Sequence, residues 1–173
     1  MSDEKHSLIG SAERATLDLR RAQLSQRYLA PSSLRASSSA RGVHHVALIC
    51  SNVEATIEFY QGLLEFPLTE MFENRDLAGS THFFFDIGLG NSLAFFDLPG
   101  VNPGTYAEVL GGLHHLAISV ESSKWQHLKA KLDDRSISYA HVDGSSLYLF
   151  DPDGARVELI SDPLGEMYGN AIG

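Results

Sequence analysis

The chain has 173 residues, of which 43% are hydrophobic and 20% charged, as in an ordinary globular domain. Its formal net charge of −9 argues against a nucleic-acid or anionic-membrane partner, and no apolar run approaches the roughly 20 residues that cross a bilayer. A polar start without an apolar core and a single cysteine, Cys50, indicate a cytoplasmic protein with no secretory signal and no internal disulfide.

The first segment of the chain differs in charge from the rest. Residues 1–42 carry a net charge of +3, whereas residues 43–173 carry −12. Residues 11–29 predict a helix with Ser11 as its N-cap, and Pro31 and the serine-rich stretch after it predict a linker. We expect residues 1–41 to form either an exposed arm or a helix that docks on a partner subunit through Leu17, Leu24, Tyr28 and Leu29.

One eight-residue phrase then occurs twice, as GVHHVALI at 42–49 and GLHHLAIS at 112–119. Each copy precedes an amphipathic helical pattern, at 53–64 and 123–132. Three strand-like runs follow each helix, at 66–71, 82–87 and 92–96 and at 137–141, 145–150 and 156–160. The sequence therefore predicts an α+β domain over 42–173, made of two tandem βαβββ modules (42–111 and 112–163) and a tail (164–173). Neither module is large enough to bury a core alone, so we expect them to assemble against each other or a second subunit.

Strand alternation separates the two histidines of each phrase. His45 and His115 fall on a face with small neighbours, which suits the lining of a shared cavity. His44 and His114 fall at the strand entrance, where a histidine is usually structural or solvated. Equivalent placement in a repeat makes His45 and His115 the candidates for metal ligands.

The segment LYLFDPDGARVEL, at 147–159, predicts a tight hairpin. A type I turn with Gly154 in the left-handed conformation pairs Asp151 with Ala155. The same register pairs Tyr148 with Glu158, on one face of the sheet.

Glu158 then lies between two apolar core positions, where a carboxylate needs a positive partner or a metal ion. Arg156, two residues away on the same face, is the ordinary partner. The alternative is a divalent cation bound by His45, His115 and Glu158. Two imidazoles and a carboxylate leave coordination positions open, as metal catalysis requires.

The phrases HHVAL, EFYQGLLEF, HHLAI and LYLFDPDGARVEL resemble the vicinal oxygen chelate superfamily. Its members include glyoxalase I, bleomycin-resistance proteins, fosfomycin-resistance thiol transferases and type I extradiol dioxygenases. The resemblance spans residues 42–163 and implies two modules that curl into an open mixed β-barrel around one metal ion. The family's ligands fall on His45, His115 and Glu158. A fourth ligand of many glyoxalase-like members falls on Ala94, which cannot ligate.

Within the superfamily the chain is most similar to the extradiol branch. The spacing from His141 through Leu147 and Tyr148 to Glu158 resembles the extradiol signature. The chain departs from that signature at Tyr139, where the signature prefers Gly, Asn, Thr or an aliphatic residue. The resemblance implies that His141 acts as acid and base and that Tyr148 lines the substrate site. Aromatic runs at 83–85 and 95–96 favour an apolar cavity. The implied activity is ring-cleaving dioxygenation of a small aromatic substrate with adjacent oxygens, with Fe(II) or Mn(II).

Two other functions stay open at this point: a glyoxalase-like lyase or isomerase, and a non-catalytic protein that binds a small molecule such as a drug. The same ligand set also accepts Zn(II), Ni(II) or Co(II). We expect a homodimer with a small-molecule substrate. The sequence does not decide whether His45 and His115 meet within one chain or across the dimer.

Overall fold

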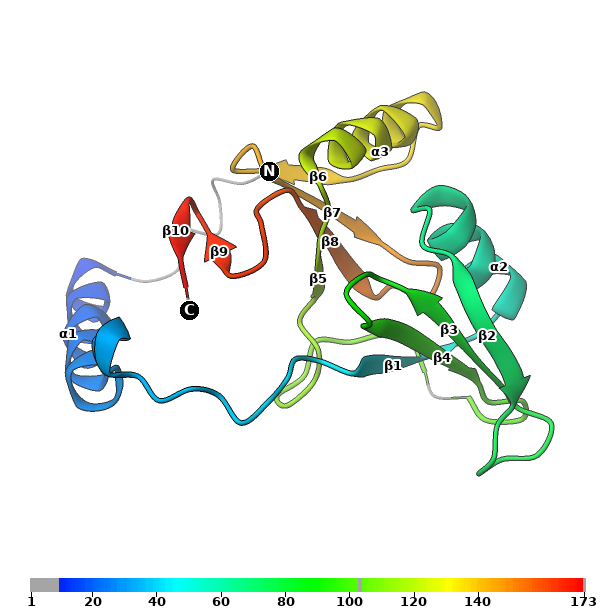
Figure 1. Cartoon of the computed structure of the whole chain (residues 1–173), viewed down its shortest axis with the longest axis horizontal. Helices are drawn as coiled ribbons and strands as arrows, with labels where there is room; N and C mark the ends of the chain where they lie inside the picture. The colour runs from blue at the N-terminus through cyan, green and yellow to red at the C-terminus, as the bar shows by residue number, and fades with distance from the viewer. Residues whose placement is uncertain (1–9, 103, 173) are drawn as a thin grey trace. The chain divides into compact units, whose positions relative to one another are not determined.

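The computed structural model describes residues 10–102 and 104–172, and its contacts divide the chain into two compact units, Met1–Arg41 and Gly42–Gly173 (Figure 1). The polar start of the chain, residues 1–7, on which the prediction of no secretory signal rests, lies outside the described residues. Within the described ranges, no helix is both long and apolar enough to cross a membrane.

The first unit contains the helix α1 (Ser11–Tyr28) and a short 3-10 helix, η2 (Ser32–Leu34). The predicted helix is present, but the prediction that Ser11 caps it is wrong. Gly10 occupies the N-cap position, with no side chain to accept a hydrogen bond, and Ser11 is already helical. No residue of α1 is buried, and Tyr28 is 69% exposed.

The second unit repeats one order of elements twice. The first module contains β1 (His45–Cys50), α2 (Val53–Ile57), the π-helical η3 (Glu58–Leu63), β2 (Leu68–Glu73), β3 (Thr81–Asp86) and β4 (Ser92–Asp97). The second contains β5 (Leu116–Ser119), α3 (Ser122–Asp134), β6 (Ala140–Val142), β7 (Ser146–Phe150) and β8 (Arg156–Ile160). A small hairpin that the sequence did not predict, β9 (Glu166–Met167) and β10 (Asn170–Ala171), follows in the tail.

Each module forms one four-stranded mixed sheet, in the orders β1-β4-β3-β2 and β5-β8-β7-β6 (Figure 1). β1 pairs with β4 in parallel, as β5 does with β8, and the other pairs are antiparallel. The α+β class and the tandem βαβββ modules are therefore confirmed. The two sheets stay separate rather than closing into one barrel, and β1 and β5 each lie at a sheet edge.

Strand alternation builds the core from one face of each sheet. Phe83, Phe85 and Phe95 are fully buried there. Their cluster includes Trp125 of α3, whose indole N–H donates to the carbonyl of Leu159 at 3.0 Å. Cys50 also lies on this face at 3% exposure. Burial raises the pKa of the Cys50 thiol to about 11, so the thiol stays protonated at neutral pH.

The DPDG hairpin has the predicted geometry. Gly154 has a φ of +88°, which a glycine adopts without strain. The Asp151 N–H donates to the Ala155 carbonyl at 2.9 Å, and Tyr148 pairs with Glu158 in the sheet. The turn also contacts the first module, since the Ser51 N–H donates to Asp153 Oδ2 at 3.0 Å.

Candidate functional site

The side chains of His115 and Glu158 meet on the sheet face opposite the core. β8 places Glu158 between Ala117 of β5 and Tyr148 of β7. His115 directly precedes β5, and its Nε2 atom lies 3.1 Å from Oε2 of Glu158. The Glu158 side chain is only 7% exposed, so this is a buried carboxylate with an imidazole donor beside it. The imidazole nitrogen of His115 and the carboxylate oxygen of Glu158 are ligand types that divalent transition metals accept.

Tyr148 completes the second-module part of the site. Its ring lies edge-on to the His115 ring, with 5.7 Å between the ring centroids. Burial, and then the neighbouring Glu158 carboxylate, raise the pKa of the Tyr148 hydroxyl to about 12. The hydroxyl therefore keeps its proton at neutral pH and can donate a hydrogen bond.

His45 does not join this pair within one chain. It lies in β1, exposed, with its ring 6.2 Å from the ring of Phe84. Among residues 10–102 and 104–172, no group of three or more His, Cys, Asp or Glu side chains is placed to hold a metal ion. The single chain thus brings together two of the three predicted ligands, His115 and Glu158.

Ala94 occupies the place in the first module that Glu158 occupies in the second. It pairs with Ala47 and Phe84, whereas Glu158 pairs with Ala117 and Tyr148. Ala94 is fully buried, and its methyl group carries no donor atom. The first module therefore has no carboxylate at the position equivalent to Glu158 that could serve as a fourth ligand.

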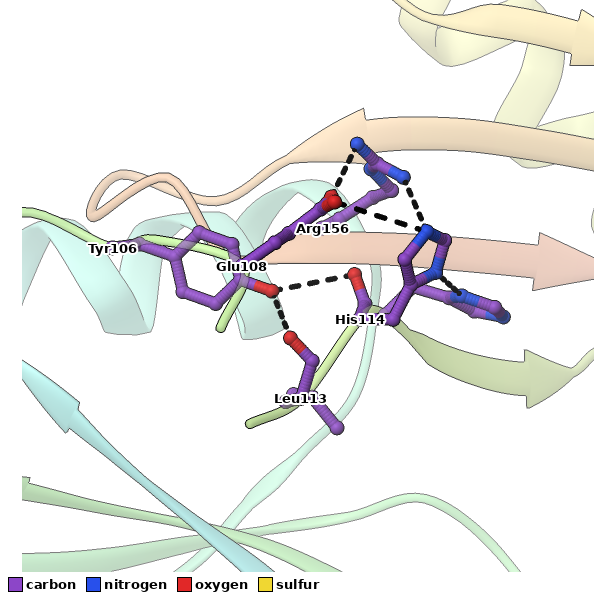
Figure 2. A network of polar contacts seen from close by, with 6 residues as sticks. Tyr106, Glu108, Leu113, His114 and Arg156 are labelled. Carbon is purple, nitrogen blue, oxygen red and sulfur yellow. Dashed lines mark hydrogen bonds and ion pairs between the residues drawn. The ribbon is translucent and has the colours of Figure 1, made fainter. Parts of the chain in front are cut away.

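Arg156 contacts the inter-module linker, the segment of residues 98–115 between β4 and β5, rather than Glu158. Its Nη2 atom lies 2.6 Å from Oε1 of Glu108, and Nη1 lies 3.2 Å from Nε2 of His114 (Figure 2). Tyr106, from the same linker, donates its hydroxyl hydrogen bond to the Leu113 carbonyl. Sequence reasoning missed Glu108, because the linker has no periodicity that would mark one of its residues as a partner of β8.

His141 lies away from the His115–Glu158 pair. In the sheet His141 pairs with Leu147, the neighbour of Tyr148 along β7. Because successive residues of a strand point to opposite faces, the His141 side chain lies on the core face with Leu147. Its ring centroid lies 5.5 Å from that of Trp125, and the residue is exposed. The chain as folded therefore places Tyr148, but not His141, beside Glu158.

The first module presents an aromatic face beside His45, which we define by Phe72, His82, Phe84 and Phe96. The His82 ring stacks on Phe96 and Phe84, with centroid distances of 3.9 and 4.3 Å. Burial and then the proximity of His45 lower the pKa of His82, so that its ring is neutral at neutral pH. Of the aromatic runs 83–85 and 95–96, Phe84 and Phe96 therefore belong to this face. Phe83, Phe85 and Phe95 are buried in the core.

A groove of about 740 Å³ follows the free edge of β1. Its lining includes Ile49, Tyr106 and Leu113, and none of the three predicted ligands. Ile49 is 45% exposed. Within the part of the chain that the structure describes, no strand pairs with β1 on the side away from β4.

Comparisons with known proteins agree with this architecture. Residues 42–159 match the model of the Glyoxalase/Bleomycin resistance protein/Dioxygenase superfamily. The chain is 23% identical over 136 residues to a curated protein of Bacillus subtilis (strain 168) named "Putative ring-cleaving dioxygenase MhqA". That match covers 74% of this chain and 42% of the relative, so the chain spans less than half of the relative's length.

Two solved structures illustrate the likeness of fold. A glyoxylase/bleomycin resistance protein/dioxygenase domain from Frankia sp. EAN1pec is 20% identical, with a TM-score of 0.61 over 74% of this chain and 96% of that one. A mutant of the fosfomycin resistance protein FosX from Listeria monocytogenes is 19% identical, with a TM-score of 0.53. The match covers 72% of this chain and 95% of the FosX chain. That FosX structure is a complex with Mn(II) and 1S,2S-dihydroxypropylphosphonic acid.

Proposed function

Because the chain belongs to the glyoxalase/bleomycin resistance protein/dioxygenase superfamily, we propose that it is a metal-dependent ring-cleaving dioxygenase. The observation that carries this proposal is the contact of His115 with the buried Glu158 carboxylate, with the Tyr148 ring beside it. The relative named as a ring-cleaving dioxygenase supports the reaction class. The substrate we propose is a small aromatic compound with two adjacent oxygens, because the face beside His45 is lined with aromatic rings.

We propose that the metal ion, Fe(II) or Mn(II), is held by His115 and Glu158 of one chain and His45 of a second copy. β1 and β5 are both edge strands, and the unpaired edge of a strand readily pairs with another chain. A homodimer with β1 of one copy beside β5 of the other would carry His45 to the open site. It would also cover Ile49, which is exposed in the single chain.

A bound divalent ion supplies Lewis acidity, which favours the deprotonated form of a substrate hydroxyl that it contacts. Tyr148, protonated at neutral pH, would donate a hydrogen bond to a substrate oxygen. The aromatic face would hold the substrate ring by stacking and exclude water from it. The acid–base role of His141 that the resemblance implies is untested and is not part of this proposal, because the His141 ring lies on the opposite face of the sheet from Tyr148.

The direct test is turnover of catechol by protein loaded with Fe(II) or Mn(II), with and without oxygen. We expect both atoms of O₂ to enter a ring-opened product, only in air. Glu158→Gln should abolish the reaction, whereas Glu166→Gln, which removes an exposed carboxylate in the tail, should not. Turnover that is unchanged without oxygen would contradict the dioxygenase assignment and favour a lyase or isomerase. Tight binding of the aromatic compound without any product would favour a binding protein.

A further inference from the structure

A continuous row of polar side chains runs from the inter-module linker to the buried carboxylate. Glu108 contacts Arg156, and both approach the same nitrogen of His114, Nε2, at 3.9 Å for Glu108 Oε2 and 3.2 Å for Arg156 Nη1 (Figure 2). The other nitrogen of His114, Nδ1, lies 2.6 Å from Nδ1 of His115. Nε2 of His115 in turn lies 3.1 Å from Glu158.

Donor and acceptor chemistry orders the protons along this row. A guanidinium only donates, so Arg156 requires a lone pair on Nε2 of His114. A neutral His114 ring then carries its proton on Nδ1 and donates it to Nδ1 of His115. His115 must therefore carry its own proton on Nε2, which faces the acceptor Glu158. With this order of protons, each of the two imidazole N–H groups faces an acceptor. Each of the two imidazole lone pairs faces a donor.

The geometry points to His114 as a positioning residue: Glu108 and Arg156 hold it so that it fixes the ring orientation and the tautomer of His115. Its role toward a metal ion rests on the proposed function, but its role in the metal-free chain does not. Residues that orient a metal-binding imidazole through its second nitrogen contribute to metal affinity.

Metal binding would reverse the order of the protons along the row, and Glu108 is the acceptor available to that order. If a metal ion takes the lone pair of His115 Nε2, the proton on that atom leaves to solvent. The shared proton passes from His114 Nδ1 to His115 Nδ1, and His114 takes up a proton from solvent on Nε2. The number of protons is unchanged. The new N–H can no longer accept from Arg156, which lies 3.2 Å away, so this order requires Arg156 to move aside and Oε2 of Glu108 to move in from 3.9 Å as the acceptor.

The first module lacks such an anchor. His44 and His45 make the same contact between their Nδ1 atoms, at 2.9 Å. Among residues 10–102 and 104–172, however, no Asp, Glu, Lys or Arg side chain forms a hydrogen bond or ion pair with the His44 ring. The contacts of Glu108 and Arg156 with the first histidine of the pair therefore occur only in the second copy of the repeat, within these described residues.

Long-range ¹⁵N–¹H spectra of the full chain, labelled at histidine, at pH 8, test the inference without a metal. We expect His114 with its proton on Nδ1 and His115 with its proton on Nε2. Zn(II) alone, added to saturation, should move these protons to His114 Nε2 and His115 Nδ1. A metal-free His114 ring with its proton on Nε2 would overturn the proposal.

Zn(II) affinity of variants gives the second readout. His114→Phe should weaken Zn(II) binding by about 10- to 100-fold. His114→Asn should recover most of that loss, because its amide lies near the place of Nδ1. Glu108→Ala should weaken binding about 10-fold, whereas Glu58→Ala, which removes an exposed carboxylate from η3, should not.

His114→Phe that binds Zn(II) within about twofold of the parent would also overturn the proposal. A parent that binds no Zn(II) would instead contradict the proposed metal site. The metal-free spectrum would then still decide the role of His114.

Discussion

The Tyr60 hydroxyl of η3 donates a hydrogen bond to Oδ2 of Asp151, in the DPDG turn, at 3.1 Å, and so ties the first module to the second. Both residues are buried, at 0% and 7% exposure. The Asp151 carboxylate also accepts the backbone N–H groups of Asp153 and Ala155, at 3.0 and 2.8 Å. Burial raises the pKa of this carboxyl, so each donor it keeps matters to the folded state.

Tyr60→Phe should therefore destabilise the chain by about 1–2 kcal/mol, because it leaves a buried carboxylate oxygen short of a donor. Urea unfolding at neutral pH measures this loss. Tyr139→Phe is the control, since it removes a hydroxyl that bonds Asp133 at an exposed position and should cost less. Equal stability of Tyr60→Phe and the parent would show that the inter-module bond contributes nothing.

Glu65 forms a further tie between the modules, and its lowered pKa predicts that stability depends on pH. Hydrogen bonds from Lys131 and His127 of α3, both 2.8 Å, lower the pKa of Glu65 from 4.5 to about 2. A lowered pKa in the folded state stabilises the fold above pH 4.5, and this stabilisation is lost as pH falls toward 2.

Glu65→Gln should thus be less stable than the parent at pH 6 by about 1 kcal/mol, a figure reduced for screening because the side chain is 35% exposed. The difference in the free energy of unfolding between Glu65→Gln and the parent should be smaller at pH 3. Urea unfolding of both proteins at the two pH values measures it. The same gap at both pH values would mean that ionisation of Glu65 is not its source.

Tyr148→Phe tests the hydrogen bond proposed to the substrate. The variant keeps the ring beside His115 but loses the only donor of that side chain. We expect kcat to fall by roughly 100-fold, with metal content unchanged, because such donors act mainly in the transition state. Steady-state kinetics with catechol and metal analysis measure both quantities. An unchanged kcat would remove Tyr148 from the mechanism.

His141→Gln distinguishes the extradiol resemblance from the observed packing. The ring contacts Trp125 on the core face, so we expect kcat to change by less than about threefold, well below the loss typical of a general acid or base. Steady-state kinetics under the same conditions measure it. A loss of a hundredfold or more would instead support the acid–base role that the resemblance implies.

The features that the sequence predicted are those that local chemistry determines. The doubled phrase revealed the two modules, and Gly154 set the turn that pairs Tyr148 with Glu158. In the aromatic run 83–85, Phe84 lies on the opposite face from the buried Phe83 and Phe85, as the period-two alternation of a strand requires. These inferences needed only neighbours along the chain.

The features that sequence reasoning missed depend on contacts between distant segments. Glu108 reaches Arg156 from a linker with no periodic pattern. The position of His141 depends on the pairing register of β6, a strand of three residues that offers too few alternating positions to define a face. The relation of His45 to His115 depends on how edge strands are covered, which no local pattern determines.

The central claim is that a metal ion binds His115 and Glu158 together with His45 of a second copy. Two variants, His45→Ala and Glu158→Ala, should each bind no metal as pure proteins. When they are unfolded together and refolded, the mixed dimer pairs the intact His45 of one chain with the intact His115 and Glu158 of the other.

Metal bound per purified mixed dimer, measured by elemental analysis after loading with Mn(II), tests this directly. The account predicts one ion per mixed dimer and none in either variant alone. No metal in the mixed dimer would contradict a site shared between copies, and full metal content in either variant alone would contradict the ligand assignment itself.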